Sequence, residues 1–182
     1  MTQGKYEGAP PAGAPSARLF LALWPDEATR TALAGFASAC HWTAAAHPTP
    51  PANLHLTIHF IGNVPAESVG ALADALQVQP MAVELKLGNL EVWPNGIAAL
   101  VPETMPDALV QLHGDLAGAL RGEGLEVESR PYRPHVTLGR KAWGTAMKGT
   151  PAAVRWTAEG HVLALSASGR YSVLRRYGYA RS

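Results

Sequence analysis

The stretch Asn53-Leu54-His55-Leu56-Thr57-Ile58-His59-Phe60-Ile61-Gly62 alternates polar and large apolar residues. Such alternation is typical of a β-strand with one face toward the core. Side chains two apart on a strand share a face, so we expect His55 and Thr57 to point together into a polar cleft while Leu56 points into the core. The same argument places His59 on the cleft face.

The pattern occurs a second time at Arg133-Pro134-His135-Val136-Thr137-Leu138-Gly139-Arg140. Here His135 and Thr137 share one face of a predicted strand, and Arg133, two residues before the histidine, belongs to that face as well. The two histidines are about 80 residues apart, and repetition at such a spacing predicts two similar halves that face each other.

Two histidines that meet at one site suit acid–base chemistry at phosphorus. Their ordinary pKa, about 6.5, lets one imidazole give a proton near neutral pH while the other accepts one. A threonine hydroxyl beside each can donate a hydrogen bond to a non-bridging phosphate oxygen. We therefore predict His55 and His135 as the catalytic pair and Thr57 and Thr137 as phosphate-binding residues, in a site that needs no metal and no cofactor.

A further match, His41-Trp42-Thr43, fits the bare pattern but lacks the sustained alternation. It runs into an alanine stretch and a proline-rich stretch. We interpret it as the structural end of a short strand, with Trp42 packed inward.

Composition indicates a globular protein without a broad basic surface. The 182 residues are 47% hydrophobic and carry a formal net charge of +1, which argues against non-specific nucleic-acid binding. The lone Cys40 excludes intramolecular disulfides. The sequence has no apolar run of transmembrane length and no secretory signal, so we expect a cytoplasmic monomer without a membrane partner.

The order of the predicted elements favours an α+β fold over a doubly wound sheet. We expect a flexible Gly/Ala/Pro-rich tail at residues 1–16 and a single domain at 17–182. The first motif strand is expected to end at Gly62. The other predicted strands are 18–24, 82–93, 97–101, 153–157, 160–165 and 170–177, and the predicted helices are 25–39, 66–77 and 106–122.

The two motifs and their surroundings resemble the two-histidine (2H) phosphoesterases, specifically the RNA 2′,3′-cyclic phosphodiesterases also described as 2′-5′ RNA ligases. The resemblance covers nearly everything from Arg18 onward. Besides the motifs it includes Arg18-Leu19-Phe20-Leu21-Ala22-Leu23, Arg130-Pro131-Tyr132 and Arg170-Tyr171-Ser172-Val173-Leu174. It implies two pseudo-symmetric lobes, each with an antiparallel sheet and flanking helices, around a central cleft.

The resemblance also implies an activity and its substrates. The enzyme would hydrolyse the 2′,3′-cyclic phosphate ends of RNA, or small nucleotides bearing that group, to 2′-phosphates, with reversible 2′-5′ ligation as a further activity. His55 would protonate the leaving ribose oxygen and His135 would activate the attacking water. Arg140 would contact the phosphate. Its odd offset of five from His135 requires a bend, which Gly139 permits. The aromatic candidates for stacking on a base are Phe20, Trp93, Tyr132 and Tyr171.

Two alternatives remain beside this interpretation. An inactive module of the same fold would bind nucleotides or RNA without turnover, although both histidines and both threonines are retained. A metallohydrolase would draw its ligands from the histidines of the first motif region, which lack a helical register and nearby cysteine or paired carboxylate ligands. Those histidines are His41, His47, His55 and His59.

Overall fold

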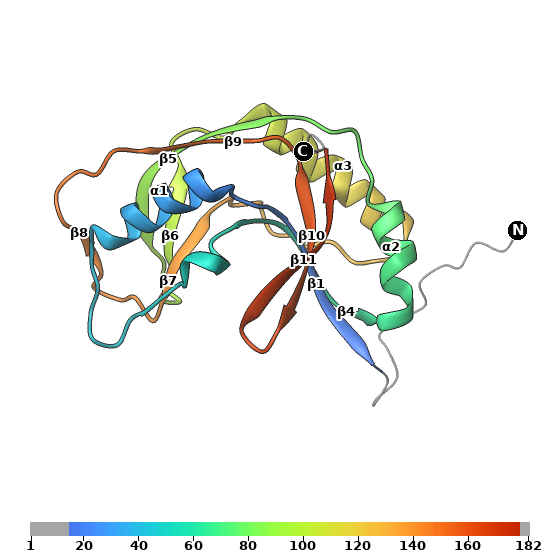
Figure 1. Ribbon diagram of the computed structural model, residues 1–182, viewed down its shortest axis with the longest axis horizontal. Helices are drawn as coiled ribbons and strands as arrows, with labels where there is room; N and C mark the ends of the chain where they lie inside the picture. The colour runs from blue at the N-terminus through green and yellow to red at the C-terminus, as the bar shows by residue number, and fades with distance from the viewer. Residues whose placement is uncertain (1–14, 179–182) are drawn as a thin grey trace, which may run out of the picture.

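The computed structural model describes residues 15–178, so nearly all of the predicted tail lies outside the described residues (Figure 1). The strands are β1 (Ser16–Leu23), β2 (Cys40–His41), β3 (His47–Pro48), β4 (Leu56–Pro65), β5 (Val83–Val92), β6 (Ala98–Pro102), β7 (Val136–Arg140), β8 (Ala146–Met147), β9 (Val154–Ala158), β10 (His161–Ala167) and β11 (Arg170–Tyr177).

The helices begin and end close to where sequence signals predict. Helix α1 starts after Asp26, whose carboxylate accepts a hydrogen bond from the Thr29 backbone N–H at 2.7 Å, the usual way to satisfy a free amide at a helix start. In α3 the predicted apolar stripe is buried and faces the core. The helical segments are α1 (Glu27–Ser38), η1 (Pro51–Asn53), η2 (Ala66–Ser68), α2 (Val69–Ala75) and α3 (Asp107–Gly122).

Among the described residues the strands form a nine-stranded antiparallel sheet in the order β11-β10-β1-β4-β7-β6-β5-β9, with β3 beside β7, and a small β2–β8 sheet. The α+β prediction is confirmed. The two predicted halves are present as two groups of strands, each with its motif strand at the inner edge. They are not separate sheets, however, because β4 pairs with β7 where Leu56 lies opposite Val136.

The helices cross between the two halves. Helix α1 follows β1 of the first group but packs against β9 of the second. Helix α3 follows β6 of the second group and packs against both β4 of the first group and β5 of the second. Figure 1 shows α1 over the β5–β7 side and α3 along the other side. This exchange ties the halves together on the face of the sheet opposite the cavity described below.

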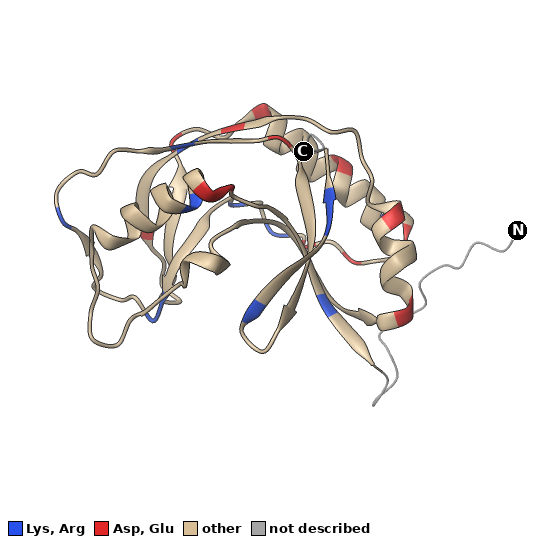
Figure 2. Cartoon of the chain, in the orientation of Figure 1, with Lys and Arg blue, Asp and Glu red and all other residues tan. Residues whose placement is uncertain are grey.

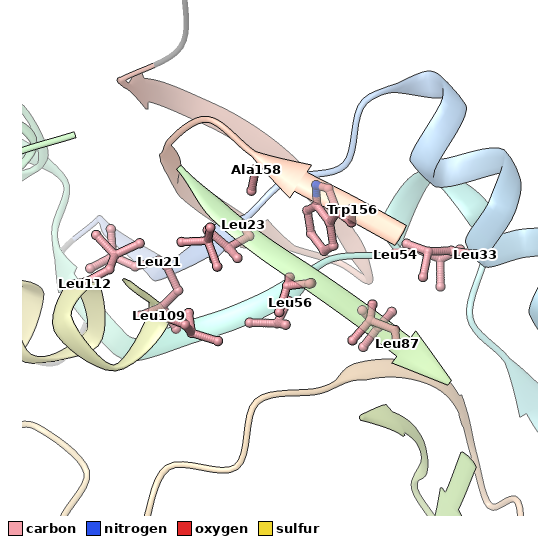
Figure 3. Packing of buried hydrophobic residues seen from close by; sticks show 14 of the residues in the cluster. Leu21, Leu23, Leu33, Leu54, Leu56, Leu87, Leu109, Leu112, Trp156 and Ala158 are labelled. Carbon is pink, nitrogen blue, oxygen red and sulfur yellow. The ribbon is translucent and has the colours of Figure 1, made fainter. Parts of the chain in front are cut away.

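The core is continuous across the junction of the halves. Leu56 and Val136 are fully buried and belong to one hydrophobic cluster. Figure 3 shows part of this cluster, with leucines from β1, β4, β5 and α3 gathered around the sheet. The apolar residues of both motif strands therefore pack on the helices, as the alternation predicts.

Some element boundaries differ from the prediction. Strand β4 does not end at Gly62 but continues to Pro65, because Gly62, at φ +87°, lies at an irregularity beyond which β1 and β4 stay paired. The helix predicted at 66–77 is a 3₁₀ turn followed by the shorter α2. Strands β3 and β8 have only two residues each and leave no periodic pattern to detect.

Truncating the side chain at the junction is expected to cost much stability. Leu56→Ala removes a fully buried side chain and should lower the free energy of unfolding by about 2–5 kcal/mol. Leu174→Ala, at a position 44% exposed, should change it by less than about 1 kcal/mol. Urea unfolding measures both variants, and similar losses would contradict the assignment of Leu56 to the core.

Candidate active site

A cavity of ≈ 680 Å³ lies at the junction of the two halves. Its walls come from β1, β4, β7, the turn between β10 and β11, and the segment 47–50. His55 and Thr57 from β4 and its approach line it, as do His135 and Thr137 from the second motif. The structure thus brings together the four residues that the two motifs predict as the centre of the site.

The two imidazoles are held in the same way. Nδ1–H of His55 donates to the backbone carbonyl of Asn53 at 2.6 Å, and Nδ1–H of His135 donates to the carbonyl of Arg133 at 2.8 Å. In each case the acceptor lies two residues before the histidine. This hydrogen bond fixes the tautomer of the neutral ring, so that Nε2 is the nitrogen free to exchange a proton.

The surroundings of His55 are aromatic. Its ring stacks on Trp24 with centroids 5.6 Å apart, and it lies 4.9 Å from the ring of Phe20 and 5.1 Å from that of Tyr171. The Thr57 hydroxyl lies 3.1 Å from Nε2, to which it donates when the ring is neutral. Phe20 lines the cavity as predicted but is only 3% exposed, so it mainly supports the imidazole.

Both histidines are electrostatically biased toward the neutral form. Burial lowers the pKa of His55 to about 4, against the raising effect of its bond to the Asn53 carbonyl, and the charges of His135 and Arg140 lower it further. The pKa of His135 is also lowered, chiefly by burial and also by Arg133 and Arg140, while Glu91 raises it. Without an anion in the cavity, a proton on either ring is unfavourable.

Arg140 reaches the cavity through a bulge in β7. Ala98 of β6 pairs with Gly139 while Ala99 pairs with Thr137, so one residue is extra on β7. This bend brings Arg140 back to the cavity side despite its odd offset from His135.

A similar bulge in β4 overturns the prediction for His59. Leu21 of β1 pairs with His59 while Ala22 pairs with Thr57, so Ile58 is the extra residue. His59 therefore turns away from the cavity and is 3% exposed. Phe60 lines the cavity in its place. The prediction failed because it assumed a regular strand.

On the far side of the sheet, His59 belongs to a stack of three rings. Its Nε2–H donates to the His113 carbonyl at 2.8 Å, and its ring stacks on that of His113 at 4.1 Å. The ring of His113 stacks in turn on Tyr132 at 4.1 Å, and the Tyr132 hydroxyl donates to the Thr57 carbonyl at 3.0 Å. The stack links α3 and the segment before His135 to the first motif strand, a structural role for both His59 and Tyr132.

Arg133 is likewise not on the cleft face, where its spacing from His135 predicts it. It is absent from the described residues that line the cavity. Its guanidinium lies over the Trp93 ring at 4.5 Å and forms an ion pair with Glu91 at 2.9 Å. The Trp93 indole also donates to Glu91, at 2.7 Å, and its ring lies 4.5 Å from that of His135. Trp93 thus packs against the His135 ring, and Arg133 packs on Trp93 in turn.

Several cavity residues are not foreseen by the sequence analysis. One of them is Phe60, which has Arg18 over its ring at 4.8 Å. The sequence analysis expects a bend after the second motif, and the same bend after the first motif predicts Phe60 on the cavity side. His47 and Thr49 belong to a segment that prolines mark as a connector, yet both line the cavity.

The cavity suits an anion and offers little to a metal. Arginines and histidines line it, and among the described residues no Asp or Glu does. Figure 2 shows acidic residues on the helices and basic ones at the outer end of β1 and the β10–β11 turn. Within residues 15–178 no group of three or more His, Cys, Asp or Glu side chains is placed to hold a metal ion. None of the described helices is long and apolar enough to cross a membrane.

Comparison with known proteins agrees with this geometry. The sequence model of the 2′-5′ RNA ligase superfamily matches residues 23–169. The RNA 2′,3′-cyclic phosphodiesterase of Escherichia coli is 30% identical over 151 residues, which are 75% of this chain and 85% of that protein. The Bacillus subtilis protein of the same name is 32% identical over 112 residues, 57% of this chain and 59% of that protein.

Solved structures share the fold over most of the chain. A crystal structure of a phosphoesterase superposes with a TM-score of 0.79 at 26% identity, covering 92% of this chain and 100% of that one. Escherichia coli LigT complexed with 3′-AMP superposes with a TM-score of 0.78 at 27% identity and the same coverage. With both motifs lining one cavity and a family match over most of its length, the chain belongs to the 2′-5′ RNA ligase superfamily of two-histidine phosphoesterases.

Proposed function

We propose that this protein is an RNA 2′,3′-cyclic phosphodiesterase that opens the cyclic phosphate to a 2′-phosphate by acid–base catalysis between His55 and His135. The observation that carries the proposal is the matched pair of imidazoles. Each is anchored through Nδ1 to a backbone carbonyl and lines, with a threonine, a cavity that no described carboxylate lines. The names of the curated relatives support the choice of substrate.

The hydrolysis needs one proton to be taken and one to be given. Nε2 of His135 accepts a proton from water as the water oxygen forms a bond to phosphorus. The bond from phosphorus to the 3′-oxygen breaks, and Nε2–H of His55 donates its proton to that oxygen. With the 5′-hydroxyl of another RNA end in place of water, the same proton transfers would join the two ends through a 2′-5′ linkage, and the reverse of that step would cleave the linkage and restore the cyclic phosphate.

Charge on the non-bridging oxygens is stabilised by groups already aimed at the cavity. The hydroxyls of Thr57 and Thr137 donate to these oxygens, and the guanidinium of Arg140 attracts their charge. The bound phosphate in turn raises the pKa of both imidazoles, because an anion favours their charged form. Substrate binding thereby makes protonation of His55 favourable at neutral pH, whereas the free protein disfavours it.

An inactive nucleotide-binding module of the same fold is the alternative. It would bind the same ligands but show no turnover. The cytoplasmic, monomeric state expected from the sequence stays a prediction.

Removing either imidazole should nearly abolish turnover. A positioned acid or base contributes about 10²–10⁴-fold, so His55→Ala and His135→Ala should each lower kcat for adenosine 2′,3′-cyclic phosphate by roughly that factor. The measurement is product formation followed by chromatography, with identification of the 2′-phosphate.

His41→Ala is the matched control, because His41 lies on β2 in the third His-x-Thr pattern and is not among the residues that line the cavity. It should leave kcat almost unchanged. Equal losses in all three variants would refute the catalytic assignment.

The pH profiles of kcat/KM and kcat should differ. In the free protein, activity needs one neutral and one charged imidazole, and the lowered pKa of both places the optimum of kcat/KM below pH 6.5. As pH rises from 6.5 to 8, kcat/KM should therefore fall. The profile of kcat reports the substrate complex, where the phosphate raises each pKa, so its optimum should lie at higher pH. Coincident optima would argue against this electrostatic effect of the substrate.

Chelation should not affect the rate. Because the proposed proton transfers and charge stabilisation come from side chains, dialysis against EDTA should leave kcat for the cyclic phosphate unchanged. The rate is measured before and after dialysis, and again after Zn²⁺ or Mg²⁺ is added. A loss that either metal restores would instead support the metallohydrolase alternative.

A further inference from the structure

A fourth His-x-Thr segment lines the same cavity. His47-Pro48-Thr49 approaches from the short strand β3, and all three residues belong to the wall. His47 and Thr49 are two apart on an extended segment, so their side chains share a face. The combination of an imidazole and a hydroxyl is the same one that the two motifs direct at the proposed phosphate.

This segment is held rigidly beside Arg140. His47 is the register partner of Arg140, and directly opposite residues of an antiparallel pair place their Cβ atoms about 4.5–5.5 Å apart on one face. The Thr49 N–H donates to the Leu138 carbonyl at 2.8 Å. Pro48 and Pro50 restrict the backbone on either side of Thr49. His47 and Thr49 are thus presented to the cavity by a stiff edge segment.

The position is separate from the catalytic centre. Arg140 lies five residues beyond His135, one of them taken up by the bulge, so about four strand steps of 3.3 Å separate their backbones by roughly 13 Å. His47, which pairs with Arg140, is therefore too far from His135 to hold the phosphate under attack. The long side chain of Arg140 spans the two positions, since its charge lowers the pKa of both His55 and His135. The ≈ 680 Å³ cavity falls in the range of sites that bury whole small ligands rather than a single anionic group.

The two ends of the cavity also differ in chemistry. The bulge in β4 brings the aromatic ring of Phe60 to the wall, whereas the bulge in β7 brings the guanidinium of Arg140. His47 stands on the guanidinium side. Among the described lining residues no carboxylate competes for the guanidinium. Arg18, over the Phe60 ring, places a guanidinium at the other end as well, so charge alone does not distinguish the two ends. What the β3–β7 end adds is the imidazole of His47 and the hydroxyl of Thr49, which can donate hydrogen bonds to a second phosphate.

We propose that His47 and Thr49, beside Arg140, form a second phosphate subsite that takes the phosphate on the 5′ side of the ribose carrying the cyclic phosphate. The inference rests on the proposed function and narrows its substrate class to nucleotides with phosphates on both sides of that ribose. In an RNA end the second group is the last phosphodiester. In a free nucleotide it is a 5′-monophosphate.

Binding of product analogues tests the subsite without requiring turnover. Adenosine 2′,5′-bisphosphate and adenosine 2′-monophosphate differ only in the 5′-phosphate. By calorimetric titration at pH 7, the wild-type protein should bind the bisphosphate roughly fivefold more tightly, as expected for a charge-assisted contact at a partly exposed site. Adenylyl-(3′→5′)-adenosine 2′-phosphate replaces the monoester with a phosphodiester, so preference for it as well indicates RNA ends, and preference for the bisphosphate alone indicates free nucleotides.

Substitutions at His47 and Thr49 test whether these residues cause the preference for the bisphosphate. His47→Ala should bring the ratio of the two dissociation constants close to one, and Thr49→Val should reduce it. His47→Arg, which supplies hydrogen-bond donors and a positive charge at the same position, should preserve it. His41→Ala should leave it unchanged. Absence of a wild-type preference, or a preference that survives in His47→Ala, overturns the subsite.

Kinetics separate this inference from the proposed function. His47→Ala should raise KM for 5′-phosphorylated adenosine 2′,3′-cyclic phosphate while leaving kcat, and both constants for the 5′-hydroxyl compound, unchanged. Equal losses with both compounds would overturn the subsite and leave the phosphodiesterase proposal standing. A protein that prefers the bisphosphate but hydrolyses neither cyclic phosphate would refute the phosphodiesterase proposal and retain the subsite.

Discussion

The site depends on the pairing of Leu56 with Val136, through which β4 and β7 join the two halves of the sheet. Both residues are fully buried in the shared core, and each is followed and preceded by the polar residues of its motif. Because neighbours along a strand point to opposite faces, burying these two apolar side chains turns His55 and His135 to the other face together. The orientation of the proposed catalytic pair is thus set by the burial of Leu56 and Val136 on the opposite face of the sheet.

A near-symmetric scaffold carries an asymmetric site. Both motifs have the same Nδ1 anchor and the same bulge after the threonine, yet the bulge delivers Phe60 in one half and Arg140 in the other. Their supports differ too, since His55 packs among aromatic rings and His135 lies against Trp93, with Arg133 and Glu91 behind it. Phe60 with Arg18 over its ring at one end, and Arg140 beside His47 at the other, make the two ends different, so a nucleotide can be oriented between them.

Burial of His55 and His135 disfavours their protonated forms, and the proposed substrate offsets this effect. Desolvation disfavours the charged form of each imidazole, and the charges of Arg140 and of the partner histidine add to the effect on His55. In the proposed complex, the negative charge of a phosphate between the rings reverses this balance because it favours the charged imidazole. Under the proposed mechanism, the free protein therefore disfavours the acid form that the substrate complex uses, and protonation is coupled to binding.

The sequence by itself determined the two motif strands, the helices with their buried stripes, and the pairing of His55 and Thr57 with His135 and Thr137, because these follow from local periodicity and repetition. It did not determine where His59 and Arg133 point, since a bulge and a competing ion pair with Glu91 are properties of neighbouring strands and of residues distant in sequence. It also gave no sign that His47 and Thr49 reach the cavity, because a two-residue strand leaves no pattern and its place is set by pairing with β7. Local alternation selects the face of a strand, but only the tertiary structure decides which faces meet and where the register slips.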